Sequence, residues 1–172
     1  MIDVLILGLI IVALMVYAST RIKRISREAF EFERIETDDF VVEKPDGLLN
    51  VVAPRAPLLL DGYSRDFGEE NASNIRKVQY SLVLRSGVDM AAAFGDIKSL
   101  GNIVSDENIV IDGMKYRDVS VEFTVDSIGY RELYRLCGNA DGTFVFKATM
   151  LEDAGDELDA AVGKMLASFQ VK

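Results

Sequence analysis

Histidine is absent from this chain of 172 residues, and cysteine occurs once. Without histidine the chain has no Ser-His-Asp or Cys-His nucleophilic pair and no zinc site with a histidine ligand. Its single cysteine, Cys137, allows neither an internal disulfide nor a thiolate cluster, and it lies in a predicted strand as a buried, inert thiol. A glycine-rich loop that cradles phosphates is also missing. We therefore expect no catalytic residue, no metal ligand and no cofactor.

Basic residues are fewer than acidic ones and are unevenly placed. The chain has 19 Lys and Arg against 28 Asp and Glu, which gives a formal net charge of −9. Nucleic-acid phosphates need Lys and Arg, so this balance disfavours nucleic acid as a partner. Four bases lie together near the N-terminus: Arg21, Lys23, Arg24 and Arg27. The rest of the chain is therefore more acidic than the whole.

A long apolar run occurs once, at the N-terminus. Residues 4–18 are apolar or small almost without a break, and Asp3 is the only charge before the basic cluster. As a helix, residues 2–18 rise about 26 Å, close to the thickness of the hydrocarbon core of a bilayer. Because the bases follow the run instead of preceding it, an uncleaved anchor is favoured over a secretory signal. The run predicts a single transmembrane helix at 1–20 that contacts membrane lipid.

The basic cluster predicts the topology of such a chain. Lys and Arg close to the end of a transmembrane helix favour the cytoplasmic side, so the following domain is expected on that face, with the extracytoplasmic side as the alternative. We expect a basic juxtamembrane helix or stalk over 21–36, with helical periodicity reaching Arg34, and a soluble domain over 37–172.

The domain has the pattern of an antiparallel sheet with helices packed on it. Apolar and polar residues alternate over 115–126, with Val119, Val121 and Phe123 on one face. Further strands are predicted at 75–85, 108–111, 130–137 and 143–151, and a hairpin joins 40–43 to 48–52. Helices are predicted from residue 87 to 100 and from residue 153 to 169. The fold class is therefore α+β.

Two short patterns resemble a known family. The helix that ends in Leu166-Ala167-Ser168-Phe169 is similar to the last helix of PsbP-like domains, and residues 39–47 resemble their opening hairpin. The resemblance spans roughly residues 38–171. It implies an αβα sandwich that serves as a scaffold or binding module without catalysis. The metal-binding residues of the plant photosystem members include histidine, so no site carries over.

One connection carries residues that a loop does not require. Tyr63, Arg65, Asp66 and Phe67 interleave aromatic and charged side chains, and we predict a surface that contacts a partner. The alternative is a strand edge packed against the core. Tyr130 and Tyr134 share one face of a strand, and Arg131 and Arg135 the other, as expected for a core face and a solvated face. The acids at 153–159 are explained by a helix start, with a divalent-cation site as the alternative.

Three functions remain open at this point. The first is a membrane-anchored, non-catalytic binding or scaffold domain that acts on protein partners at the membrane surface. The second is an accessory subunit of a larger membrane complex, whose anchor helix makes the specific contacts. The third and least favoured is a carboxylate- or metal-dependent enzyme. The sequence predicts no oligomeric state.

Overall fold

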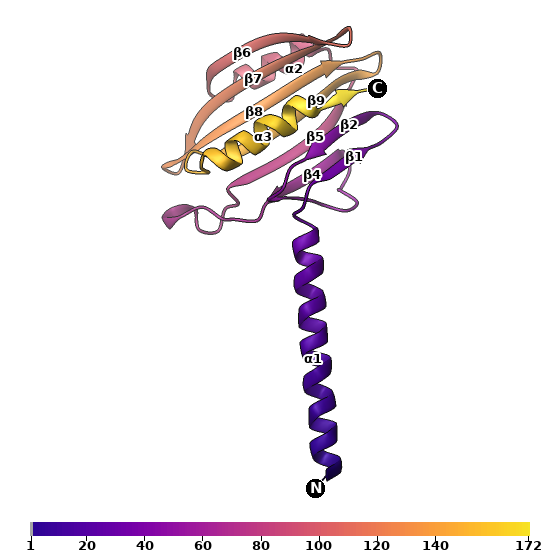
Figure 1. Ribbon diagram of the computed structural model, residues 1–172. Helices are drawn as coiled ribbons and strands as arrows, with labels where there is room; N and C mark the ends of the chain where they lie inside the picture. The colour runs from indigo at the N-terminus through magenta and orange to yellow at the C-terminus, as the bar shows by residue number, and fades with distance from the viewer. Residues whose placement is uncertain (1) are drawn as a thin grey trace.

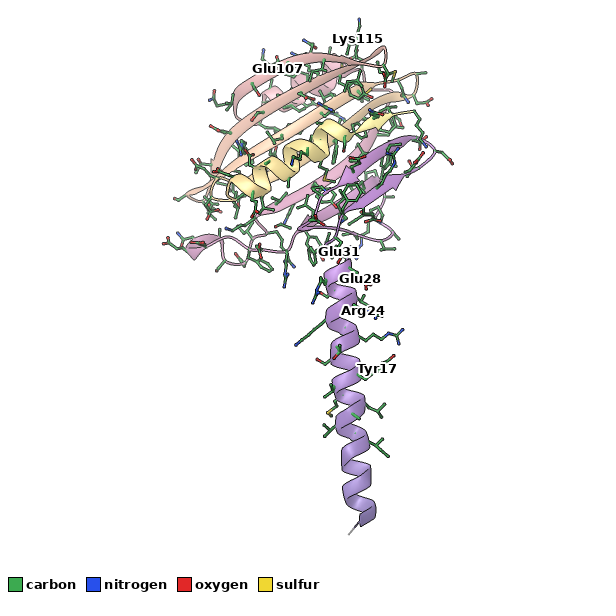
Figure 2. The ribbon with its side chains drawn as sticks, in the orientation of Figure 1. Tyr17, Arg24, Glu28, Glu31, Glu107 and Lys115 are labelled. Carbon is green, nitrogen blue, oxygen red and sulfur yellow. The ribbon has the colours of Figure 1, made fainter. Side chains whose placement is uncertain are left out.

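The computed structural model describes the backbone of residues 2–172 and the side chains of residues 10–172. Its first element, helix α1 (Ile2–Glu28), stands away from a folded body that holds all the other elements (Figure 1). The described side chains of α1, Tyr17 and Arg24 among them, are exposed (Figure 2). The helix ends before the predicted Arg34 because residues 33–36 form a strand, β1 (Glu33–Glu36).

The structure contradicts the predicted transmembrane anchor. Residues 1–9 of that segment lie outside the side chains that the structure describes. In the described part of the chain, no helix combines the length and the apolar character that crossing a membrane requires. The physical reason is that four basic residues enter α1 from Arg21 onward, so the described part of the helix, from Ile10, has too short an apolar stretch. The predicted single-pass helix, and the membrane localisation inferred from it, are therefore wrong. No finding tests the rest of the predicted division, a segment 21–36 and a domain 37–172.

Seven antiparallel strands form the main sheet, in the order β3-β4-β5-β9-β8-β7-β6. The predicted meander is confirmed as β7, β8 and β9, with Tyr134 lying between Val119 and Lys147. Strand β6 is longer than predicted, and it joins β7 through Asp112 and Gly113, whose positive φ values of 51° and 83° suit a tight hairpin. The bounds are β3 (Leu48–Asn50), β4 (Leu58–Ser64), β5 (Val78–Ser86), β6 (Asn102–Ile111), β7 (Met114–Val125), β8 (Ile128–Gly138) and β9 (Gly142–Leu151).

A second sheet of three strands has the order β1-β2-β10, with β2 (Phe40–Lys44) in the middle and β10 (Gln170–Val171) at one edge. The predicted hairpin of 40–43 with 48–52 is wrong, because β2 pairs with β1 and β10 whereas β3 pairs with β4. Lys44 lies at the point where the chain passes from one sheet to the other. Its side chain is fully buried, and Nζ donates hydrogen bonds to the carbonyl oxygens of Glu31 and Leu48. The turn after Lys44 thus carries the chain from one sheet to the other.

Both faces of the main sheet are covered. Helix α3 (Asp156–Ser168) and the small sheet lie over one face, and helix α2 (Met90–Lys98) lies over the other (Figure 1). Under α3 the core centres on Phe169, whose ring contacts four others: Phe40, Tyr116, Phe144 and Phe146. Under α2 a smaller cluster gathers Ile97 with residues of β7 and β8. The domain is therefore α+β, as the sequence pattern predicts.

The predicted solvated face of β8 is corrected by this arrangement. Arg135 is 4% exposed, because it lies under α3 and binds the carboxylate of Asp118. A buried charge is tolerated when a partner and further hydrogen bonds compensate its lost hydration. The alternation of polar and apolar residues in β7 and β8 thus separates two core faces, one of which holds an ion pair.

Candidate functional site

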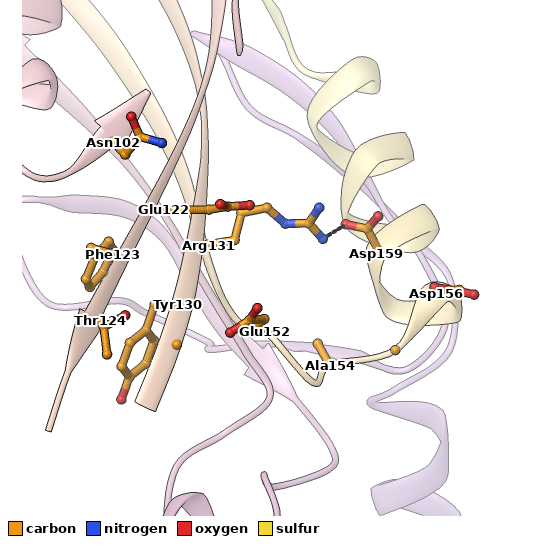
Figure 3. Close-up of a pocket in the computed structure, with 12 residues that line it drawn as sticks. Asn102, Glu122, Phe123, Thr124, Tyr130, Arg131, Glu152, Ala154, Asp156 and Asp159 are labelled. Atoms are coloured by element: carbon orange, nitrogen blue, oxygen red, sulfur yellow. Dashed lines mark hydrogen bonds and ion pairs between the residues drawn. The ribbon is translucent and has the colours of Figure 1, made fainter. Parts of the chain in front are cut away.

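A hollow of about 500 Å³ lies at one end of the main sheet, where the hairpin between β7 and β8 meets the start of α3 (Figure 3). Its walls come from elements that are distant in the sequence, so the fold assembles it. The lining residues are Asn102, Glu122, Phe123, Thr124, Gly129, Tyr130, Arg131, Glu152, Ala154, Gly155, Asp156 and Asp159.

Negative charge dominates the walls of this hollow. Arg131 is the single base among the lining residues, and its guanidinium pairs with the carboxylate of Asp159 across the space (Figure 3). Asp156 and Asp159 lie in the first turn of α3, where negative charge is favourable because of the helix dipole. The position of these acids is therefore explained without a ligand.

Glycine at position 129 lets the hollow take its shape. A Cβ atom there would lie 2.1 Å from Oε2 of Glu152, so any larger residue would displace that carboxylate. Beside it, the rings of Tyr130 and Phe123 stack with centroids 5.4 Å apart and planes at 11°. Among the described residues, no three His, Cys, Asp or Glu come together as ligands for a metal ion. The hollow thus offers charged and aromatic walls, and the prediction of no metal ligand stays a prediction.

The predicted contact residues lie at another place, beside strand β4. Tyr63 belongs to β4, and Arg65, Asp66 and Phe67 follow it in the connection to a short 3-10 helix at Glu70–Ala72. Phe67 is 44% exposed, and both interpretations of this connection, a partner contact or a strand edge packed against the core, stay predictions.

Arg76 also belongs to this surface, and the sequence did not predict it. Its guanidinium carbon lies 3.9 Å from the ring centre of Phe67 and 4.6 Å from that of Tyr63. An isolated β-bridge between Phe67 and Arg76 brings the two segments together. We call Tyr63, Arg65, Asp66, Phe67 and Arg76 the stacked-arginine surface. Its sequence signal was weak, because Arg76 comes nine positions after Phe67 and lies next to a polar loop.

Backbone hydrogen bonds hold the stacked-arginine surface in place. Nη1 of Arg76 donates to the carbonyl oxygens of Arg65, at 2.6 Å, and of Ser64, at 3.4 Å. The buried hydroxyl of Ser64 donates to the carbonyl oxygen of Asp66 and accepts from the backbone N–H of Val78. The connection is therefore fixed to both β4 and β5, and its exposed side chains are presented on a rigid support.

The other predicted site residues, the four basic ones, lie on α1 and not in the stacked-arginine surface. Arg24 forms an exposed ion pair with Glu28, with 3.4 Å between Nε and Oε1. Such a pair contributes little to stability. No finding tests a role of Arg21, Lys23, Arg24 and Arg27 next to a membrane.

The tyrosine and cysteine side chains whose pKa values are shifted lie in the core. Burial raises the pKa of Tyr134, and the hydrogen bond that its hydroxyl makes with Glu132 acts in the same direction. Burial also raises the pKa of the Tyr80 hydroxyl and of the Cys137 thiol. Cys137 is fully buried, as predicted, and its raised pKa disfavours the reactive thiolate.

Comparison with known proteins identifies the fold. No family model matches the chain, and no curated protein matches its sequence. The structure of cyanobacterial PsbP (CyanoP) from Synechocystis has a TM-score of 0.57 at 14% identity, over 83% of this chain and 94% of that one. LpqN of Mycobacterium tuberculosis, a protein involved in cell envelope biogenesis, has a TM-score of 0.59 at 13% identity, over 83% of this chain and 91% of that one. The predicted resemblance is therefore confirmed as a likeness of fold: the chain has a PsbP-like fold.

Proposed function

We propose that this chain is a non-catalytic binding or scaffold domain that acts on a protein partner through the stacked-arginine surface. The observation that carries the proposal is the contact of Arg76 with the rings of both Tyr63 and the exposed Phe67. Aromatic residues and arginine are the side chains most enriched at the energetic centres of protein interfaces. Because the hydrogen bonds that Arg76 and Ser64 donate to the backbone already order the connection, a partner meets a surface that loses little entropy on binding.

The chemistry of the chain supports binding over catalysis. Histidine, the commonest general base, is absent from the sequence. A shared fold does not by itself define a function, so the proposal rests on the surface and not on the likeness to PsbP or LpqN. The composition of the surface, two aromatic rings around one cation with a mixed rim, fits a protein partner better than a polyanion.

A second candidate function is favoured by helix α1. Its apolar side chains are strongly exposed: Leu14 is 62% exposed and Met15 is 67% exposed. Apolar surface of this extent is typical of a site that another molecule covers. In this alternative the chain is an accessory subunit of a larger assembly, and α1 makes the specific protein contacts.

Site-specific photo-cross-linking in the cells that make the protein separates the two candidates. The photoreactive residue benzoylphenylalanine replaces Phe67, Leu14 or, as a control, Leu100, which follows α2 and is 53% exposed. If the stacked-arginine surface binds the partner, position 67 gives a discrete cross-linked protein that positions 14 and 100 do not give. A discrete product from position 14 alone supports the accessory-subunit alternative. Equal labelling from positions 67 and 100 contradicts the proposed function.

A further inference from the structure

We propose that Arg76 is a receptor for a carboxylate, namely an Asp or Glu side chain of the partner protein, which binds the free edge of its guanidinium group. This inference rests on the proposed function of the stacked-arginine surface. It adds the chemistry of the group that the surface recognises.

The guanidinium of Arg76 has one edge in use and one edge free. Nη1 donates to the carbonyl oxygens of Arg65 and Ser64. Within the described part of the chain, Nε and Nη2 donate no hydrogen bond. Two parallel N–H groups on one edge of a guanidinium match the two oxygens of a carboxylate. The guanidinium is held by the two hydrogen bonds that Nη1 donates and by contact with the rings of Tyr63 and Phe67, so it is positioned before a ligand arrives.

Two other arginines of the chain show the complete form of this arrangement. Arg117 lies over the ring of Phe94, with 3.3 Å from its guanidinium carbon to the ring centre, and its Nε and Nη2 bind Asp106 at 2.7 Å each. Both interactions of Arg117 are thus satisfied within the chain, one by an aromatic ring and one by a carboxylate.

The second example lies beneath α3. Arg135 lies over the ring of Tyr116 at 5.7 Å, and its Nε and Nη2 bind Asp118 at 2.7 and 2.6 Å. Arg76 shares the stacking and lacks the carboxylate: none of the described acidic side chains forms an ion pair with it. The group missing from Arg76 is therefore the one that both counterparts hold, an Asp or Glu carboxylate on Nε and Nη2.

The charge around Arg76 favours a ligand with one carboxylate over a ligand segment that carries several acidic residues. The neighbouring Arg65 is exposed and adds positive charge, whereas Asp66 adds negative charge to the same connection. The chain as a whole carries a formal charge of −9, so a strongly acidic segment is repelled at long range. A single Asp or Glu flanked by uncharged residues is the ligand that this balance accepts.

A titration of the full chain followed by NMR tests the inference. The probes are the blocked peptides acetyl-Gly-Glu-Gly-amide and acetyl-Gly-Gln-Gly-amide, which differ only in the carboxylate. We expect the Nε–H signal of Arg76 to shift saturably with the Glu peptide and not with the Gln peptide. In Arg76→Lys the affinity for the Glu peptide falls about tenfold, since the ammonium group cannot form the paired contact. Arg55→Lys, at another exposed arginine, is the control and binds as the wild type does.

A second variant keeps the test decisive if Arg76→Lys fails to fold. Phe67→Leu removes one stacking ring at an exposed position, leaves the guanidinium in place, and is expected to weaken binding of the Glu peptide. Equal shifts with both peptides, or binding that is unchanged in both variants, overturns the inference. If position 67 still cross-links a partner under those results, the proposed function stands without the carboxylate receptor. If the Glu peptide binds but position 67 gives no product, the proposed function fails and with it the partner protein as the source of the carboxylate, although Arg76 is still shown to bind a carboxylate.

Discussion

Arg135 and Asp118 form a two-pronged ion pair between neighbouring strands β8 and β7, with Nε–Oδ1 at 2.7 Å and Nη2–Oδ2 at 2.6 Å. The third donor of Arg135, Nη1, binds the carbonyl oxygen of Ala167 at 2.9 Å, in the last turn of α3. One buried side chain therefore joins the sheet to the helix that covers it. It also satisfies one of the carbonyl groups that a helix C-terminus leaves without a partner.

Removing the carboxylate of this pair is expected to destabilise the fold. Asp118→Ala leaves the guanidinium of Arg135 buried without its counter-charge, which costs about 3 kcal/mol of unfolding free energy. Urea unfolding followed by circular dichroism measures the loss. Asp159→Ala is the matched control, since its partner Arg131 also extends from β8 to α3 but is 35% exposed, and the expected loss is below about 1 kcal/mol. Equal losses in the two variants would contradict the role of burial.

Asp106 is expected to make stability depend on pH in the acid range. The hydrogen bond from Arg117 holds the pKa of Asp106 below its ordinary value of 3.8. The unfolded chain therefore binds more protons than the folded one below about pH 5, and stability is lost as pH falls through the folded pKa. Asp106→Asn should unfold with a shallower acid dependence, in urea titrations at several pH values. Arg117→Gln should give the same shallower curve, and a steep curve in either variant would refute the assignment.

Lys44 is expected to make stability depend on pH in the alkaline range. Burial lowers the pKa of Lys44 below its ordinary value of 10.5, although Glu33 and Asp46 act in the opposite direction. Between the folded pKa and 10.5 the unfolded chain binds the extra proton, so the contribution of Lys44 to stability rises with pH across that window. In Lys44→Met this contribution is absent. The difference in unfolding free energy between wild type and variant should change in favour of the wild type as pH approaches 10.5. If the unfolding free energies of wild type and variant stay parallel as pH rises, the prediction for Lys44 is wrong.

Two glycines should respond differently to alanine. At Gly62 a Cβ would lie 2.1 Å from the backbone oxygen of Leu49 and 2.2 Å from the ring of Tyr80, so Gly62→Ala is expected to cost about 3 kcal/mol or more. At Gly129 the nearest atom is the end of the flexible Glu152 side chain, and Gly129→Ala should cost below about 1 kcal/mol. Thermal unfolding measures both, and a similar fall in melting temperature for the two variants would be the contrary result.

The meander of β7, β8 and β9 was predictable from sequence because its signals are local. Alternation over 115–126, and the turn at Asp112-Gly113 that leads from β6 into the meander, depend only on neighbouring residues, and both are found in the structure. The covering helices were predictable for the same reason. Asp89 accepts a hydrogen bond from the backbone N–H of Ala92 and so begins α2, close to the predicted helix start.

The features that sequence reasoning missed all depend on pairing across the fold. Arg135 was expected in solvent because its own strand does not reveal that Asp118 lies opposite it. Arg76 joins Tyr63 and Phe67 only after the connection folds back onto β5. The predicted anchor is wrong for another reason: in the described part of α1, the basic residues that follow the apolar run leave no stretch long and apolar enough to cross a membrane. Local pattern thus predicted the elements, whereas the ion pairs and the stacked-arginine surface needed the tertiary structure.

The last strand has a consequence for how the protein is made. Val171 pairs with Phe40, and the ring of Phe169 fills the centre of the aromatic core. A nascent chain therefore lacks the middle of its core and one edge of its small sheet until residue 171 has left the ribosome. The hydrophobic surface of the earlier strands stays open until Phe169 and Val171 have emerged, so the core closes only once these residues are in place. Chaperones that shield nascent chains have that whole interval in which to act.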